Sequence, residues 1–187
     1  MAMNISRNRA LALSAFLIAL NVAVRLTPHT PNVTPLAATA LFASFLLESG
    51  ILAAAVPILA LAIGDLVIGG YDWRVMAVVY AALAVPVLFG HYLRGRLGAV
   101  RIAASALASS VVFFLTTNFA VWCYGYWYTR DLKSLLQCYT AAVPFFRNTV
   151  VGDLLWSFIL FTGYAVVRQS RPVILIPDTG SNSPGDR

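Results

Sequence analysis

The sequence predicts an all-α integral membrane bundle of about six transmembrane helices. Of its 187 residues, 60% are hydrophobic and only 11% are charged, and the mean hydropathy is +0.80. Soluble domains average about 45–50% apolar and about 25% charged residues. Apolar runs near the length of a bilayer crossing recur along the chain. The formal net charge of +6 comes from basic residues beside these runs, which is typical of membrane orientation and not of nucleic-acid binding.

The first span is expected at residues 10–26, after a short basic N-terminus at residues 1–9 that we place in the cytoplasm. Ala15, Ala19 and Ala23 recur along it at every fourth position. Such a stripe of small residues lets another helix approach closely. The use of alanine as plain apolar filler explains the stripe equally well.

Three further spans are predicted in the next part of the chain. Residues 35–47 follow a loop with three prolines and are apolar. They are short for a full crossing at about 1.5 Å per residue, so we expect a tilted or partial span. Residues 51–68 form the third span. Residues 75–93 form the fourth, with Pro86 as the position of a kink.

The last two spans and the C-terminus complete the predicted single transmembrane domain, residues 10–168. Residues 102–122 form the fifth span. A surface helix is expected at about residues 131–142, and Pro144 then opens the sixth span, residues 144–168. The segment 169–187 is polar and rich in Gly and Pro, which favours a disordered cytoplasmic tail.

Six crossings place both termini on one side of the membrane. The densest basic cluster, formed by Arg94, Arg96 and Arg101, falls on that same side. Because Lys and Arg are enriched on the cytoplasmic side, we expect the N-in, C-in orientation.

Polar residues gather toward the outer ends of several predicted spans. Ionisable groups inside spans are costly, usually face a cavity or a partner, and mark function. Arg147 pairing with Asp65 or Asp153 solely to satisfy buried charges is the structural alternative. We expect instead an outward-facing pocket with these ligand-binding residues: Asp65, Asn118, Trp122, Arg147, Asn148, Asp153 and Trp156.

Two helix faces supply the neutral part of this predicted pocket. Asn118 and Trp122 lie four positions apart and therefore share a face of span five. Asn148, Gly152 and Trp156 share a face of span six in the same way. Asn148 offers a side-chain amide, Gly152 leaves a gap because it has no side chain, and Trp156 offers a flat aromatic surface.

The remaining chemistry-bearing residues are two cysteines, Cys123 and Cys138, which lie 15 positions apart. That spacing is neither a zinc signature nor a redox motif. Free buried thiols, a loop-closing disulfide and a ligand or metal contact by Cys138 all stay open. The sequence has no nucleotide-binding motif and no catalytic constellation, so we expect neither an enzyme nor a bound cofactor.

Four segments carry a resemblance to a known group: NVTPLAATALF, AIGDLVIG, TTNFAVWCYG and CYTAAVPFFRNTVVGDL. Over roughly residues 30–165 they resemble an uncharacterised bacterial six-span membrane family. That family is similar to the S component, the substrate-binding subunit, of energy-coupling-factor vitamin transporters.

The resemblance implies a bacterial inner-membrane protein that holds a vitamin-like small molecule near the outer face. Ala15, Ala19 and Ala23 would then meet a transmembrane coupling subunit that joins two ATPases. Solitary cobalamin transporters of that group use a cysteine to coordinate cobalt. Cys138 or Cys123 would take that part, which makes cobalamin a candidate ligand. The alternative is a non-transporting scaffold or assembly protein whose polar layer is structural.

Overall fold

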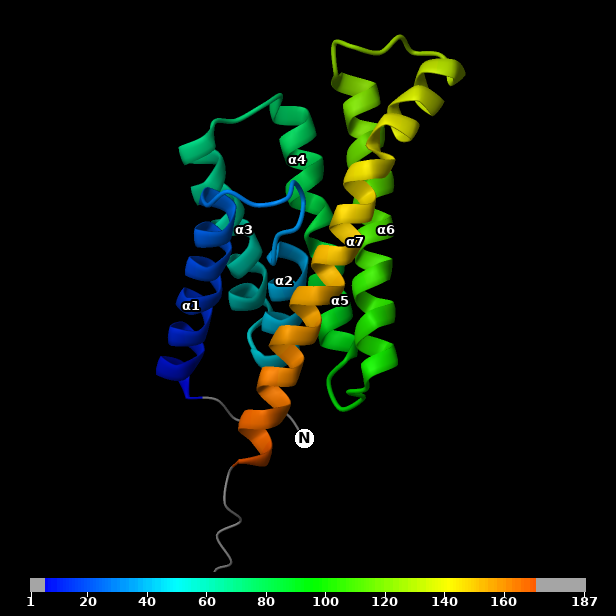
Figure 1. Ribbon diagram of the computed structural model, residues 1–187. Coiled ribbons are helices and arrows are strands. Elements are labelled where there is room, and N and C mark those ends of the chain that lie inside the picture. Colours follow the sequence, from blue (N-terminus) through cyan, green and yellow to red (C-terminus); the bar gives the residue numbers. More distant parts are fainter. Residues whose placement is uncertain (1–5, 171–187) are drawn as a thin grey trace, which may run out of the picture.

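The computed structural model describes residues 6–170, and the regular structure within that range is entirely α-helical (Figure 1). The all-α prediction is therefore confirmed for this part of the chain. Residues 1–5 and 171–187, which include nearly all of the predicted tail, lie outside the described residues. The helices are α1 (Arg7–Leu26), α2 (Leu36–Leu46), α3 (Gly50–Ile68), α4 (Trp73–Ala82), α5 (Ala84–Tyr92), α6 (Ala99–Tyr124) and α7 (Leu132–Gln169).

Five of the described segments are long and apolar enough to cross a membrane. They are Arg7–Leu26, Gly50–Ile68, Trp73–Tyr92, Ala99–Tyr124 and Leu132–Gln169. α2 is a shorter apolar helix. In Figure 1 successive helices run alternately up and down, except that α5 continues in the direction of α4, and α1 begins at the same end of the bundle where α7 ends.

The loops divide between the two ends of the bundle. Loops 27–35, 69–72 and 125–131 lie together at one end, which we call the loop end (Figure 1). Loop 93–98 lies at the other end of the bundle, where α1 begins and α7 ends, which we call the terminal end.

The short helix α2 forms the centre of the bundle. Every side chain from Ala38 to Ser44 is buried, and α2 contacts α1, α3, α5, α6 and α7. At about 1.5 Å per residue, its 11 residues are too few to cross a bilayer alone. The expected partial span is therefore a core element enclosed by the longer helices.

Arg94 stabilises the end of α2. Its Nε donates to the Ser44 carbonyl at 2.9 Å, its Nη2 donates to the same oxygen at 2.6 Å, and Nη2 also contacts the Leu47 carbonyl. The last carbonyls of a helix lack intrahelical partners, so Arg94 supplies the missing donors. This member of the predicted basic cluster has a structural role as well as a place in the charge pattern.

The predicted kink in the fourth span is confirmed as a break at Leu83, between α4 and α5. Pro86 has no N–H to donate to the carbonyl four residues earlier, that of Ala82, and its ring crowds that carbonyl. The Leu83 N–H instead reaches the Tyr80 carbonyl at 3.3 Å. This bond spans three residues instead of four, so the helix is tightened by one turn at the break.

α7 differs from the expected surface helix followed by a separate span. It is one helix of 38 residues with Pro144 inside it, and its first turns bend away from the rest (Figure 1). A helix-interior proline commonly kinks a helix without ending it. Contacts with α6 hold the first turns in place: the Tyr139 hydroxyl donates to the Leu115 carbonyl at 2.7 Å, and its ring packs edge-on to Phe114.

Candidate functional site

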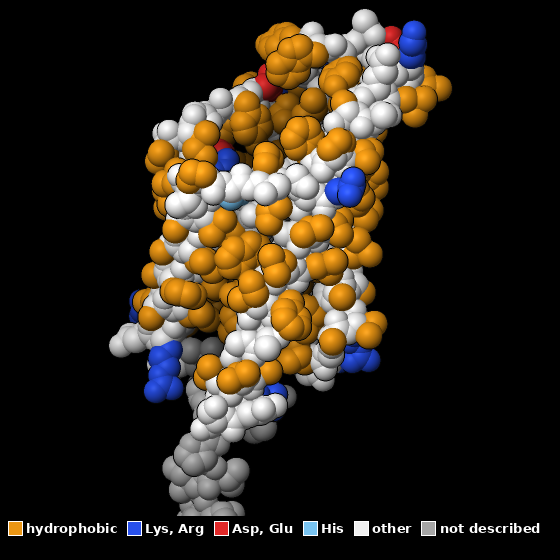
Figure 2. All heavy atoms as spheres, viewed as in Figure 1, with side chains coloured by type: hydrophobic (Ala, Val, Ile, Leu, Met, Phe, Trp, Pro, Cys, Tyr) orange, Lys and Arg blue, Asp and Glu red, His pale blue; other side chains and the backbone are white. Residues whose placement is uncertain are grey.

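A cavity of about 460 Å³ lies at the loop end, between loop 27–35 and residues of α2, α3, α4, α6 and α7. Figure 2 shows a hollow near this end, bordered by hydrophobic side chains with acidic and basic ones at its edge. Most of the wall is apolar, contributed by residues such as Leu61, Val79 and Phe113. The polar lining residues are Arg25, Asn32, Thr34, Tyr71, Thr117, Thr149 and Asp153.

Arg25, which lines the cavity, belongs to an ion pair between α1 and α3. Arg25 Nη2 lies 2.5 Å from Asp65 Oδ1, and the Tyr80 hydroxyl donates to Asp65 Oδ2 at 3.2 Å. Asp65 is buried, with 5% of its side chain exposed, whereas 28% of the Arg25 side chain is exposed. Arg25 passes directly over Gly64, where any Cβ would overlap its Cδ and Nε. The glycine therefore gives Arg25 its route to Asp65.

Asp153, on α7, also lines the cavity. Only 4% of this residue is exposed, and the Ser110 hydroxyl of α6 donates to its Oδ2 at 2.6 Å. Ser110 belongs to a buried polar strip of α6 with Ser105 and Ser109. The two ion pairs found among residues 6–170 are Arg25–Asp65 and Arg74–Asp72, so neither includes Asp153.

Loop 27–35 is seated against α7 at Gly152. A Cβ built there would lie 2.9 Å from Val33 Cα, 3.2 Å from the Asn32 oxygen and 3.3 Å from the Thr34 nitrogen. The gap that the sequence predicted at Gly152 is therefore filled by loop backbone. Asn32 has a positive φ of 66°, which asparagine tolerates better than most residues. This close seating brings Asn32 and Thr34 into the cavity wall.

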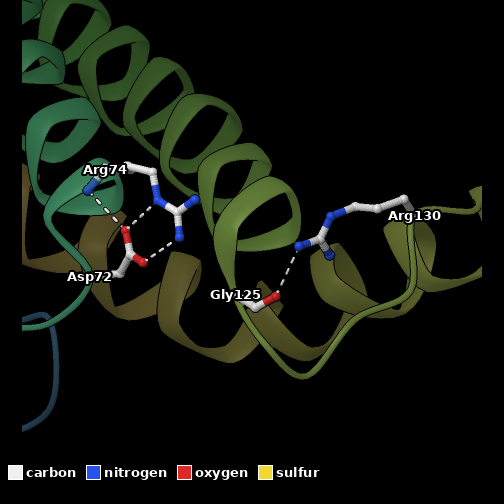
Figure 3. Close-up of polar contacts among 4 residues, drawn as sticks. All are labelled: Asp72, Arg74, Gly125 and Arg130. Atoms are coloured by element: carbon white, nitrogen blue, oxygen red, sulfur yellow. Dashed lines mark hydrogen bonds and ion pairs between the residues drawn. The ribbon is translucent and has the colours of Figure 1, made fainter.

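Two cationic side chains at the loop end, those of Arg74 and Arg130, make polar contacts with nearby residues (Figure 3). Asp72 caps the start of α4 by accepting from the Arg74 N–H at 2.9 Å, and it also pairs with the Arg74 guanidinium at 2.7 Å. The side-chain hydrogen bond from Arg74 lowers the pKa of Asp72 to about 2. Arg130 donates to the Gly125 carbonyl at 3.1 Å. Arg74 also lies over the Tyr124 ring at 4.8 Å, which joins α4 to the end of α6.

The structure brings some of the predicted ligand-binding residues together. Asp153 lines the cavity, and Asp65 holds Arg25 at its wall. Asn118 lines a second cavity of about 180 Å³. Asn32, Phe113, Thr117 and Thr149 line both cavities, so the two spaces are adjacent. The Asn118 amide donates to the Phe114 carbonyl of its own helix at 2.8 Å.

Arg147 does not pair with Asp65 or Asp153, contrary to the structural alternative. Its side chain is exposed on α7, and Arg25 occupies the position beside Asp65. Arg147 and Asp153 are six positions apart, which is about 120° around a helix. One residue therefore faces outward while the other faces α6.

The other three predicted residues lie outside the cavity. Trp122 fastens the 125–131 loop, because its Nε1 donates to the Thr129 carbonyl at 3.0 Å and to Ser134 Oγ at 3.1 Å. Asn148 and Trp156 are half-buried on α7 and line neither the 460 Å³ nor the 180 Å³ cavity. Within the described part of the chain, the Trp156 Nε1 is buried and has no hydrogen-bond partner.

Several cavity residues were missed by sequence reasoning. Tyr71 and Trp127 come from loops 69–72 and 125–131. Burial, followed by the charge of Asp65, raises the pKa of Tyr71 to about 12, so its phenol stays neutral. Thr149 lies four positions before Asp153. That spacing places both residues on one helix face, so the sequence could have indicated Thr149 as a neighbour of Asp153.

Cys123 and Cys138 are both free thiols, so the loop-closing disulfide is not formed. Cys138 is buried with its Sγ 3.5 Å from the Asn118 carbonyl, and neither cysteine lines the 460 Å³ cavity. Within residues 6–170, no three His, Cys, Asp or Glu side chains gather to hold a metal ion. Cysteine-ligated cobalamin therefore has no support in this geometry.

Residues 5–174 match the model of a family of unknown function (DUF6580). No curated protein and no solved structure matches the chain.

Proposed function

We propose that this chain, which belongs to the DUF6580 family, is a substrate-binding membrane subunit for uptake of a vitamin-like small molecule. The supporting observation is the 460 Å³ cavity, because small-molecule sites are typically about 300–1,000 Å³, largely apolar, and supplied with a few convergent polar groups. The wall of this cavity combines apolar side chains with a few polar ones. In this proposal the chain binds its substrate and performs no chemistry on it.

The proposed membrane arrangement has six passes, of which five are the long helical segments and one is the short enclosed α2. Both termini lie in the cytoplasm and the loop end lies outside the bacterial inner membrane. The charge distribution supports it. Two of the cations at the loop end, Arg25 and Arg74, are paired with aspartates. The basic residues toward the terminal end include Arg7, Arg9, Arg96, Arg101 and Arg168. An excess of Lys and Arg is typical of the cytoplasmic side.

The proposed partner is a transmembrane coupling subunit associated with ATPases. Ala15, Ala19 and Ala23 are all exposed on α1, whereas Leu17 and Asn21 are buried against the bundle. The stripe of small residues is therefore free of contacts that would block a second helix. Such stripes allow close helix approach in membranes.

A scaffold without a ligand is the second candidate function. The observation that favours it is the fastening role of two predicted site residues: Asp65 joins α3 to α1, and Trp122 joins α6 to the start of α7. A scaffold needs these contacts but has no use for an occupied cavity. The two functions therefore differ in whether the cavity carries a molecule.

Purification in mild detergent followed by mass spectrometry of small molecules tests the proposed function. Val79→Trp fills the cavity, because Val79 lines it. Val151→Trp is the matched control, because Val151 on α7 is 58% exposed and lies outside the cavity lining. We expect a compound to accompany the wild type and Val151→Trp but not Val79→Trp. A wild-type protein purified without any compound from vitamin-replete cells would favour the scaffold.

A further inference from the structure

Asp153 is a buried acid without a positive partner. Its one hydrogen bond among the described residues comes from Ser110, and the residue is 4% exposed. The Ser110 hydroxyl also lies 3.1 Å from the Ala106 carbonyl, so its single proton has two possible acceptors. An isolated buried carboxylate is costly, and buried charges are normally paired. Asp153 also lines the 460 Å³ cavity, so a partner can reach it from there.

Arg25, the cation of the cavity lining, is already compensated by Asp65 behind it. Arg25 contacts Asp65 at 2.5 Å, and the Tyr80 hydroxyl supplies a further donor to Asp65. With this pair balanced, Asp153 is the acid of the cavity lining that has no positive partner among the described residues. A ligand that places a positive charge beside Asp153 would compensate it.

The rest of the lining favours an organic cation over a metal ion. No group of three metal-binding side chains exists within residues 6–170, and bound Mg²⁺ or Ca²⁺ takes about six or more oxygen ligands. Three aromatic rings, those of Tyr71, Phe113 and Trp127, line the same cavity. Aromatic faces attract organic ammonium groups, and an apolar ligand body would fit the remaining wall.

We propose that the cavity selects a ligand with a protonated amine or another cationic nitrogen, which pairs with Asp153 between the aromatic side chains. This inference rests on the proposed function and names the charge class of its substrate. The carboxylate provides the counter-charge, and the aromatic wall provides the surroundings that an ammonium group prefers. Arg25 and Asp65 position the wall without contributing net charge.

Charged thiol reagents measure this preference without knowledge of the natural ligand. Thr149→Cys, in a background with Cys123→Ala and Cys138→Ala, places a thiol on the cavity wall one turn before Asp153. Its reaction rates with trimethylammonioethyl and sulfonatoethyl methanethiosulfonate are compared in detergent, each relative to a free thiol. Tyr126→Cys is the control, because Tyr126 is 87% exposed in loop 125–131 and does not line the cavity.

We expect the cation-to-anion rate ratio at position 149 to exceed that at position 126 by about tenfold or more, because a charge at close range in a partly buried site shifts rates by at least that factor. Asp153→Asn should remove most of the difference. Equal ratios at the two positions, or an anion preference at position 149, would overturn the inference. That comparison holds even where Asp153→Asn fails to fold.

The thiol reaction rates and the mass spectrometry of the purified protein together distinguish this inference from the proposed function. A neutral or anionic compound that occupies the cavity would keep the uptake role and overturn the cationic ligand. A cation preference in a protein that carries no compound would support the cation site and count against the uptake role.

Discussion

Asp65→Asn is expected to lower the free energy of unfolding by about 3 kcal/mol. Removal of one partner of a buried ion pair typically costs about 3–5 kcal/mol, because the other charge is left uncompensated. The lower end applies here because 28% of the Arg25 side chain remains exposed. The substitution also turns the acceptor of the Tyr80 hydroxyl into a neutral amide. Unfolding in detergent, followed by near-ultraviolet circular dichroism, measures the loss.

Asp72→Asn is the matched control for this substitution. Asp72 also pairs with an arginine, but the pair lies at the surface, where ion pairs contribute little, and asparagine is an equally good N-cap. We expect this variant to unfold almost like the wild type. Combining Arg25→Leu with Asp65→Asn should recover part of the lost stability, because neither charge of this ion pair then remains without its partner. Simple additivity of the two single substitutions would mean that Arg25 and Asp65 are not coupled.

Gly90→Ala is expected to be similarly disruptive, at about 3 kcal/mol. A Cβ at Gly90 would overlap the Leu41 carbonyl oxygen and lie 2.8 Å from Ser44 Cβ. Overpacking a core costs about 1–3 kcal/mol and occasionally more. The high value applies here because the obstacle is backbone of α2, which is enclosed by other helices and has little room to retreat. The Ser44 hydroxyl bond to the Val87 carbonyl, 2.5 Å long, would be strained by the same displacement.

Gly163→Ala isolates the effect of crowding from the effect of helix propensity. Gly163 is also inside a helix, but a Cβ there would have no atom within 4 Å. Alanine is favoured over glycine in helix interiors by about 1 kcal/mol, so this variant should be slightly more stable than the wild type. Equal stability of Gly90→Ala and Gly163→Ala would contradict the close contact between α5 and α2.

Local sequence patterns predicted the helices well because they depend on neighbouring residues. Apolar runs placed α1, α3, α6 and the α4–α5 span within a few residues, and Pro86 placed the break in the fourth span. Pro144 was misleading, because a proline can end a helix or bend it, and contacts with α6 decide which. Tyr139 supplies such a contact through the Leu115 carbonyl, and no local pattern encodes it.

The candidate site was predicted only in part because pairing between distant residues cannot be read from one sequence. Asp65 and Asp153 were identified as ionisable groups inside spans. Their partners, Arg25 and Ser110, lie 40 and 43 positions away. The structural roles of two glycines are equally hard to read from the sequence. Gly64 leaves room for Arg25 to reach Asp65, and Gly152, which the sequence predicted as a gap in the pocket, is where loop 27–35 packs against α7.

Labelling of a cavity thiol in intact cells tests the outward-facing binding cavity most directly. Thr117→Cys, without the two native cysteines, places the thiol on the cavity wall, and Gly98→Cys places one in open space at the terminal end. The reagent is the membrane-impermeant trimethylammonioethyl methanethiosulfonate. We predict that position 117 is labelled from outside the cell and that position 98 is labelled only after permeabilisation. Labelling of position 98 but not 117 in intact cells would place the cavity on the cytoplasmic side and contradict uptake from the outer face.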